Sequence, residues 1–203
     1  MNVVHDIVNS LEMLMNTATR RENLRDALTD AAARTIADQG LSGLKARALA
    51  DEVGCAVGAS FAVLIAEELF ACGCKLLISL TSAGQIEVLG APPYFVVIDR
   101  ALRDEGTSDH YAPPAEFANA DAALVAAASA ALQASGLHAF VGASWTTDAP
   151  FRETIDAIAW AKSRGAVAVE MEAAALYTFA SVTKARVLCL AHVTNTMAQA
   201  GQD

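Results

Sequence analysis

The stretch Val169-Glu170-Met171-Glu172-Ala173-Ala174-Ala175-Leu176-Tyr177 joins a short apolar strand directly to a helix. Two carboxylates and a thioether lie at the junction. Doubly wound α/β proteins bind small molecules at the carboxyl ends of their strands, and 170–172 would lie at that edge. Glutamates at a helix start also interact well with the helix dipole when no ligand is involved. The stretch therefore predicts an α/β fold and a candidate ligand site, with a solvated helix N-terminus as the alternative.

Apolar strands alternate with helical patterns on both sides of this junction. The strands are expected at 75–81, 94–99, 139–145, 166–170 and 187–193, and the helices at 61–70, 121–133, 150–162 and 171–181. Such alternation predicts a mostly parallel sheet flanked by helices, with right-handed crossovers.

Three further segments accompany Val-Glu-Met-Glu-Ala-Ala, in the order Leu-Leu-Ile-Ser-Leu-Thr-Ser-Ala-Gly-Gln (76–85), Arg-Asp-Glu-Gly-Thr-Ser-Asp-His-Tyr-Ala-Pro-Pro (103–114) and Ser-Trp-Thr-Thr-Asp-Ala-Pro-Phe (144–151). Together the four resemble the family of purine and uridine phosphorylases and their hydrolytic relatives, the nucleosidases. Four motifs in the family's order are far more specific than any one of them. We therefore expect 61–203 to form an incomplete α/β domain of the nucleoside phosphorylase type.

The resemblance implies a site for a nucleoside and for phosphate as co-substrate, with no metal and no other cofactor. Catalytic roles fall on Glu172, which would accept hydrogen bonds from the ribose hydroxyls, and on Asn195, whose amide would stabilise the leaving base. The residues implied in substrate binding are Met171 under the sugar, Glu170 beside it, Phe151 at the base, and Ser82 and Gly84 at the phosphate and ribose edge. Each has a plain structural alternative as a core, turn or loop residue.

The chain departs from the family's pattern at the phosphate site. Many phosphorylases have a phosphate-binding arginine where this chain has Ser79, and their glycine-rich phosphate loop has no counterpart here. A dianion is hard to bind without arginine. Arg100 and Arg103 are the candidates to replace it, and we expect impaired turnover if neither does.

Residues 23–61 instead resemble the DNA-binding region of Tet-repressor-like regulators. A first helix is expected over 29–40, a second over 44–53, and a recognition helix from Cys55. In this interpretation 1–60 is an all-helical, helix-turn-helix-like segment, and Lys45, Arg47 and Ser60 are the candidate DNA contacts. The expected recognition helix has few donors for phosphates or bases, and an ordinary pair of packed helices is the alternative.

Composition is consistent with a protein of the cytoplasm. The net charge is −9, which disfavours general attraction to nucleic acid, and the apolar run at 61–80 is interrupted by Glu67, Glu68 and Lys75, so no membrane span is expected. The four cysteines lie in apolar segments without zinc-site spacing, which favours free buried thiols over a metal site.

Three functions are consistent with the sequence. The first is a nucleoside-cleaving enzyme, phosphorylase or nucleosidase, which the family implies to be a homo-oligomer. The second is a DNA-binding regulator with a nucleoside-sensing domain. The third is an inactive fusion remnant. Release of free base, salt-dependent DNA binding and noncooperative melting respectively would distinguish them.

Overall fold

The computed structural model describes residues 30–31, 34–35, 37–38, 58–137 and 139–196. The chain divides into two compact units, 1–57 and 58–203. In the first unit the described residues are helical, as expected over 29–40, and the Thr35 hydroxyl donates to the Ala31 carbonyl at 2.9 Å. The other residues of the expected helix-turn-helix up to 57, including Lys45 and Arg47, lie outside the described residues.

The second unit alternates helices and strands as the sequence predicts. Its elements are α3 (Ala59–Ala71), β1 (Leu77–Gln85), β2 (Tyr94–Asp104), η2 (Ser108–His110), β3 (Phe117–Asn119), α4 (Ala122–Ala134), β4 (Ala139–Thr147), η3 (Pro150–Arg152), α5 (Ile155–Ser163), β5 (Ala166–Glu170), α6 (Ala173–Thr183) and β6 (Val187–Thr196). All the expected elements are present, with shifted bounds. The short strand β3 was missed, and the helix expected from Pro150 starts at Ile155, after a 3-10 turn.

Five of the six strands close into a ring. The order β3-β2-β4-β5-β1-β6 is completed by a pairing between β6 and β2, and β3 extends the edge of β2. β2–β4, β4–β5 and β1–β6 are parallel, whereas β1–β5, β2–β3 and β2–β6 are antiparallel. The two longest ladders are parallel, as expected. The antiparallel pairings make the sheet mixed, and two of them close the ring.

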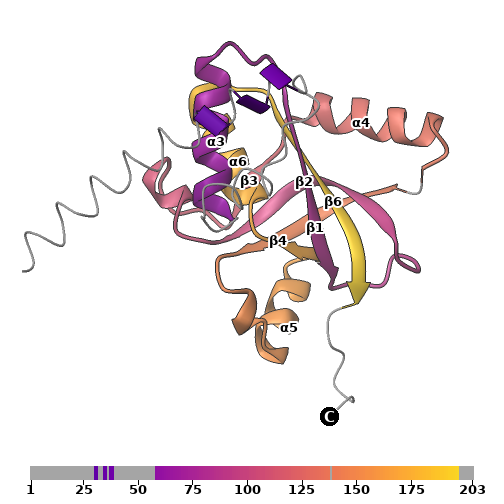
Figure 1. The fold of residues 1–203 in the computed structure, drawn as a ribbon. Coiled ribbons are helices and arrows are strands. Elements are labelled where there is room, and N and C mark those ends of the chain that lie inside the picture. Colours follow the sequence, from indigo (N-terminus) through magenta and orange to yellow (C-terminus); the bar gives the residue numbers. More distant parts are fainter. Residues whose placement is uncertain (1–29, 32–33, 36, 39–57, 138, 197–203) are drawn as a thin grey trace, which may run out of the picture. The chain divides into compact units, whose positions relative to one another are not determined.

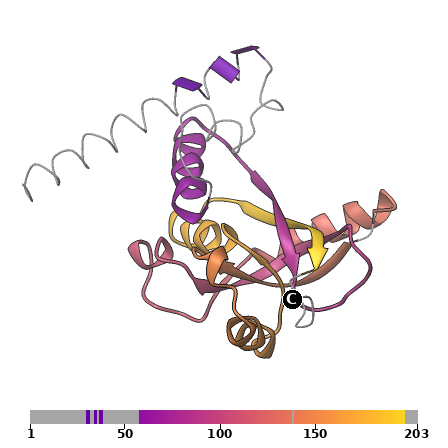
Figure 2. The same ribbon diagram turned by 60° about the horizontal axis from the view of Figure 1, so that its bottom comes forward.

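Helices cover both faces of this sheet. α3 packs on α6, and α6 packs on β2, β3, β4 and β6. α4 lies over β2 and β4 on the other face, because Leu188 of β6 points to α4 while Cys189 points to α6. α5 covers β5 and lies across the sheet from α3 and α6 in both views (Figure 1, Figure 2). None of the described helices is long and apolar enough to span a membrane.

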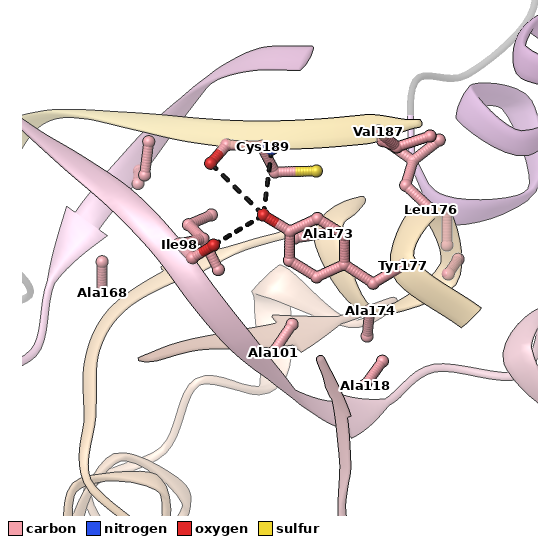
Figure 3. Close-up of a cluster of buried hydrophobic side chains, with 14 of the residues drawn as sticks. Ile98, Ala101, Ala118, Ala168, Ala173, Ala174, Leu176, Tyr177, Val187 and Cys189 are labelled. Atoms are coloured by element: carbon pink, nitrogen blue, oxygen red, sulfur yellow. Dashed lines mark hydrogen bonds between the residues drawn. The ribbon is translucent and has the colours of Figure 1, made fainter. Parts of the chain in front are cut away.

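Tyr177 fixes α6 to the sheet. Its buried hydroxyl donates to the Ile98 carbonyl of β2 at 2.6 Å and accepts from the Cys189 N–H of β6 at 3.0 Å (Figure 3). The β2–β4 ladder shifts register between Ile98 and Arg100, where such a bulge leaves backbone groups for other partners. Buried polar groups are costly unless paired, so these bonds specify how deeply α6 sits. The start of α6 is thereby held in place.

Candidate functional site

Glu170 ends β5, and its carboxylate caps the helix that follows. Oε2 accepts from the N–H groups of Glu172 and Ala173, both at 2.7 Å. Oε1 accepts from the hydroxyls of Ser144, at 2.9 Å, and Thr146. The side chain is only 3% exposed. Because both oxygens are bound within the chain, Glu170 organises the junction from inside rather than presenting a carboxylate to solvent.

Burial, and after it the nearby Glu172 carboxylate, raises the pKa of Glu170 to about 7, although the Thr146 hydroxyl and the N–H groups of Glu172 and Ala173 oppose the shift. Desolvation disfavours the charged form of an acid, whereas donors pointing at it favour that form. Burial prevails, so this carboxyl titrates near neutral pH.

Thr146, near the end of β4, connects two neighbouring strand ends. Its hydroxyl donates to Glu170 and accepts from the Ala174 N–H of α6 at 3.0 Å. The two residues are direct partners in the parallel β4–β5 ladder, so the sheet itself brings them together. One hydroxyl thus satisfies the strand-end carboxylate and an otherwise unpaired N–H of the first helical turn.

Glu172 lies where β5 passes into α6, and its carboxylate contacts β1. The side chain is 8% exposed, and its Oε2 accepts from the Thr81 hydroxyl at 2.8 Å. The antiparallel β1–β5 register pairs Gly84 with Val169 and therefore carries Thr81 toward Glu172. The two glutamates face different partners, since one binds its own helix and the other binds a distant strand.

Three of the other candidates lie on strands that meet this junction. Gly84 pairs with Val169 of β5 and with Asn195 of β6, so the backbones of Gly84 and Asn195 are neighbours. Ser82 is exposed, and strand alternation places it on the opposite face of β1 from Thr81. The sheet therefore places the backbones of Gly84 and Asn195 side by side next to Val169, whereas Glu172 lies beside Thr81, and the Ser82 hydroxyl points to the opposite face of β1.

Met171 and Phe151 differ sharply in environment. Met171 is half-buried, and a Cβ built on Gly58, just before α3, would lie 3.6 Å from its Cε. Phe151 lies in η3, between β4 and α5, and is 83% exposed. The thioether is thus held beside the start of α3, whereas the ring expected at the base extends into solvent.

The two arginines considered for the phosphate site contact the region around β3 and η2. Arg103 donates to Asp109 at 2.6 Å and to the Pro113 carbonyl at 2.8 Å, so it holds the 103–114 segment together. The Arg100 guanidinium lies 5.1 Å from the centroid of the Phe117 ring. Both guanidinium groups therefore contact residues of the segment between 109 and 117.

Of the candidate DNA contacts, only Ser60 is described. It is exposed in the first turn of α3, between the buried Ala59 and Phe61. α3 packs on α6, so this part of the expected recognition helix belongs to the α/β unit.

Comparison with known proteins identifies the family. The model of the phosphorylase superfamily matches residues 28–203. The chain belongs to the phosphorylase superfamily. Among solved structures, it is similar to AMP nucleosidase from Bacteroides thetaiotaomicron VPI-5482, at 27% identity with a TM-score of 0.62. That match covers 67% of this chain, which spans 60% of the length of the nucleosidase chain. No curated protein sequence matches the chain.

The phosphorylase superfamily match confirms the family expected from the four motifs, together with its α/β fold. It begins at residue 28, within the segment that resembles a Tet repressor, and no comparison supports that second resemblance. Within the described part of the chain, no group of three or more His, Cys, Asp or Glu side chains is placed to hold a metal ion.

The sequence reading gave no role to Thr81, Ser144 or Thr146, which hold the two glutamates. Each lies in one of the four motifs, Thr81 in the middle of β1 and the other two in the second half of β4. The signal that points to them is a hydroxyl residue at an inward position of a strand, where a buried carboxylate needs a donor. Choosing which glutamate each hydroxyl serves requires the strand order.

Proposed function

We propose that this protein cleaves the N-glycosidic bond of a purine or pyrimidine nucleoside, or of its 5′-monophosphate, at the β5–α6 junction. The observation that carries the proposal is the Glu172 carboxylate, which is nearly buried just after β5 and accepts a hydrogen bond from the Thr81 hydroxyl. A carboxylate in such a place is suited to accept hydrogen bonds from the 2′ and 3′ hydroxyls of a ribose.

The chemistry asks for stabilisation of separated charge. The bond between C1′ and the base nitrogen breaks as the sugar becomes cation-like and the base takes the electron pair. Glu172 holds the ribose and stabilises positive charge on it, and the amide of Asn195 stabilises negative charge on the base. Met171 packs under the sugar and Phe151 covers the base. Glu170 acts indirectly, because its oxygens hold the backbone that carries Met171 and Glu172.

Water is the acceptor that we favour over phosphate. β1 (Leu77–Gln85), which carries Ser79, Ser82 and Gly84, contains no charged residue. A dianionic co-substrate would need cations that this strand does not supply. Similarity to an AMP nucleosidase supports the same choice and makes AMP the first substrate to assay. The complete reaction adds water to C1′ and returns free base and a ribose with a hydroxyl at C1′.

The test is an assay of free-base release from AMP, adenosine, inosine and uridine, each with and without phosphate. Release that does not depend on phosphate, with a reducing sugar as co-product and loss of activity in Glu172→Ala, supports hydrolysis. A phosphate-dependent reaction that yields ribose 1-phosphate supports phosphorolysis instead. If no base is released from any substrate and none binds in calorimetry, the proposal fails. Salt-dependent DNA retention without turnover would favour the regulator interpretation.

We further propose that the protein is a homo-oligomer, as the family resemblance implies, and that it acts in the cytoplasm, with which its composition is consistent. Light scattering after size-exclusion chromatography tests the subunit number. A single monomer peak at assay concentrations would contradict the homo-oligomer.

A further inference from the structure

Thr81 reaches the candidate site because β1 crosses the carboxyl end of β5. The β1–β5 ladder is antiparallel and short, pairing Gly84 with Val169 and Gln85 with Ala168. Continued by three residues, this register brings Thr81 opposite Glu172. Their hydrogen bond at 2.8 Å joins residues 91 positions apart. The contact is a product of the strand arrangement.

The carboxylate of Glu172 is not directed by its own helix. Glu172 precedes α6 with φ −131° and ψ −34°, and its side chain makes no capping hydrogen bond. The N–H groups of Glu172 and Ala173 are already taken by Glu170. The Thr81 hydroxyl supplies a donor on the β1 side and so gives the Glu172 carboxylate a defined direction.

Thr81 is itself held rigidly. It is half-buried and pairs with Ala191 in the long parallel ladder between β1 and β6. A β-branched side chain in a strand has few χ1 rotamers, so little freedom is lost when the hydroxyl binds. A donor of this kind is fixed before any ligand arrives, which is the condition for orienting a functional group to within a fraction of an ångström.

We infer that Thr81 is a positioning residue, which orients the Glu172 carboxylate toward the two hydroxyls of the ribose. The inference rests on the proposed function, because the direction of the Glu172 carboxylate matters for activity only if that carboxylate binds a ribose. It also assigns Thr81 a role in selecting the sugar. A misdirected Glu172 carboxylate no longer accepts hydrogen bonds from the 2′ and 3′ hydroxyls of a ribose. A sugar that lacks these hydroxyls makes no such bonds even in the parent protein.

The experiment compares Thr81→Val, which removes the hydroxyl at nearly constant volume, with Thr81→Ser, which keeps it. For each variant kcat/KM is measured on a ribonucleoside and on the matching 2′,3′-dideoxyribonucleoside. Thr183→Val in the last turn of α6, where the hydroxyl donates only within its own helix, is the matched control. Thermal melting of every variant reports folding.

Thr81→Val is expected to lower kcat/KM on the ribonucleoside by about tenfold or more, the value of one charge-assisted hydrogen bond. It lowers kcat/KM on the dideoxyribonucleoside much less, because only the charge stabilisation by Glu172 is weakened there. Thr81→Ser recovers most of the loss, and Thr183→Val behaves as the parent. Equal losses on both sugars, or no loss, overturn the positioning role while the proposed function stands. A parent protein that neither cleaves nor binds nucleosides overturns the proposed function, and this inference with it.

Discussion

Two neighbouring connections of the sheet, β5–α6 and β4–α5, are built in opposite ways. The first is buried, and its Glu170 accepts four hydrogen bonds from β4 and α6. The second also has side-chain bonds, from the Gly106 N–H to the Asp148 carboxylate and from the Ala157 N–H to the Thr154 hydroxyl, but these lie at exposed positions. There, Phe151 and Ile155 are 83% and 67% exposed. Both follow strands that run parallel, so topology alone does not explain the contrast.

The contrast separates two tasks of a nucleoside site. A ribose presents fixed hydroxyls, and a preorganised carboxylate recognises them best when its surroundings are already paired. A base presents a flat apolar face, which an exposed ring covers without such preparation. In the proposed enzyme, the fold therefore preorganises the part of the site that binds the sugar. The part that binds the base forms only when a ligand packs against the exposed Phe151 ring.

The largest effect is expected from removing the buried cap. Glu170→Ala leaves two hydroxyls and two N–H groups without their acceptor inside the protein, and the free energy of unfolding should fall by about 4 kcal/mol. Chemical denaturation at pH 6 measures it. The matched control is Asp121→Ala, because Asp121 caps α4 with two N–H bonds at an exposed site and should cost only about 1 kcal/mol. Equal losses of stability in the two variants would show that burial does not make the Glu170 cap more stabilising than the exposed Asp121 cap.

Next in size is the loss of the Glu172 carboxylate, which is proposed to bind the sugar. Glu172→Ala should reduce kcat/KM for base release by about 100-fold or more, because an interaction made with the cation-like sugar disappears. Nucleoside affinity in calorimetry should fall in parallel. Asp156→Ala, in the exposed first turn of α5, is the control and should match the parent. Unchanged affinity in the Glu172 variant would remove the assignment of this site.

A smaller effect is expected from pH. In the folded protein the Glu170 pKa is raised to about 7 from an ordinary value of 4.5, so between these two pH values the folded state binds more protons than the unfolded state. Its contribution to stability is complete below pH 4.5 and is lost as pH rises through 7, by about 3 kcal/mol. Denaturation midpoints across this range measure the slope of the free energy of unfolding against pH. Glu170→Gln should flatten it, and a variant with the parent's slope would assign the titration to another group.

The smallest effect on stability is expected at the exposed connection. Phe151→Ala should change the free energy of unfolding by less than about 0.5 kcal/mol, because the ring is already in solvent. If the ring covers the base, KM should rise about fivefold with kcat nearly constant. Phe151→Tyr, which keeps the ring, should preserve KM. A large loss of stability in Phe151→Ala would mean that the two connections are more alike than their burial indicates.

Much of the fold was predictable because helices and strands are encoded locally. The alternation of apolar strands with alanine-rich helices placed every long element of the α/β unit, and Asp121 marked the start of α4. Closure of the ring was not predictable, since the β2–β6 and β1–β5 pairings join distant segments and leave no periodic trace. The three-residue strand β3 was also missed, because so short a segment shows no periodic pattern and becomes a strand by pairing with β2.

For the candidate site, the sequence determined which side chains stand where β5 passes into α6. Two glutamates separated by one residue stand at the point where a strand becomes a helix. They can be recognised from the residues next to them in the sequence alone. Only the tertiary structure decided their division of labour. Glu170 turns inward to Ser144, Thr146 and the start of α6, whereas Glu172 turns to Thr81. The physical reason is that a carboxylate's environment is set by the strands beside it, and strand order is fixed by packing of the whole sheet.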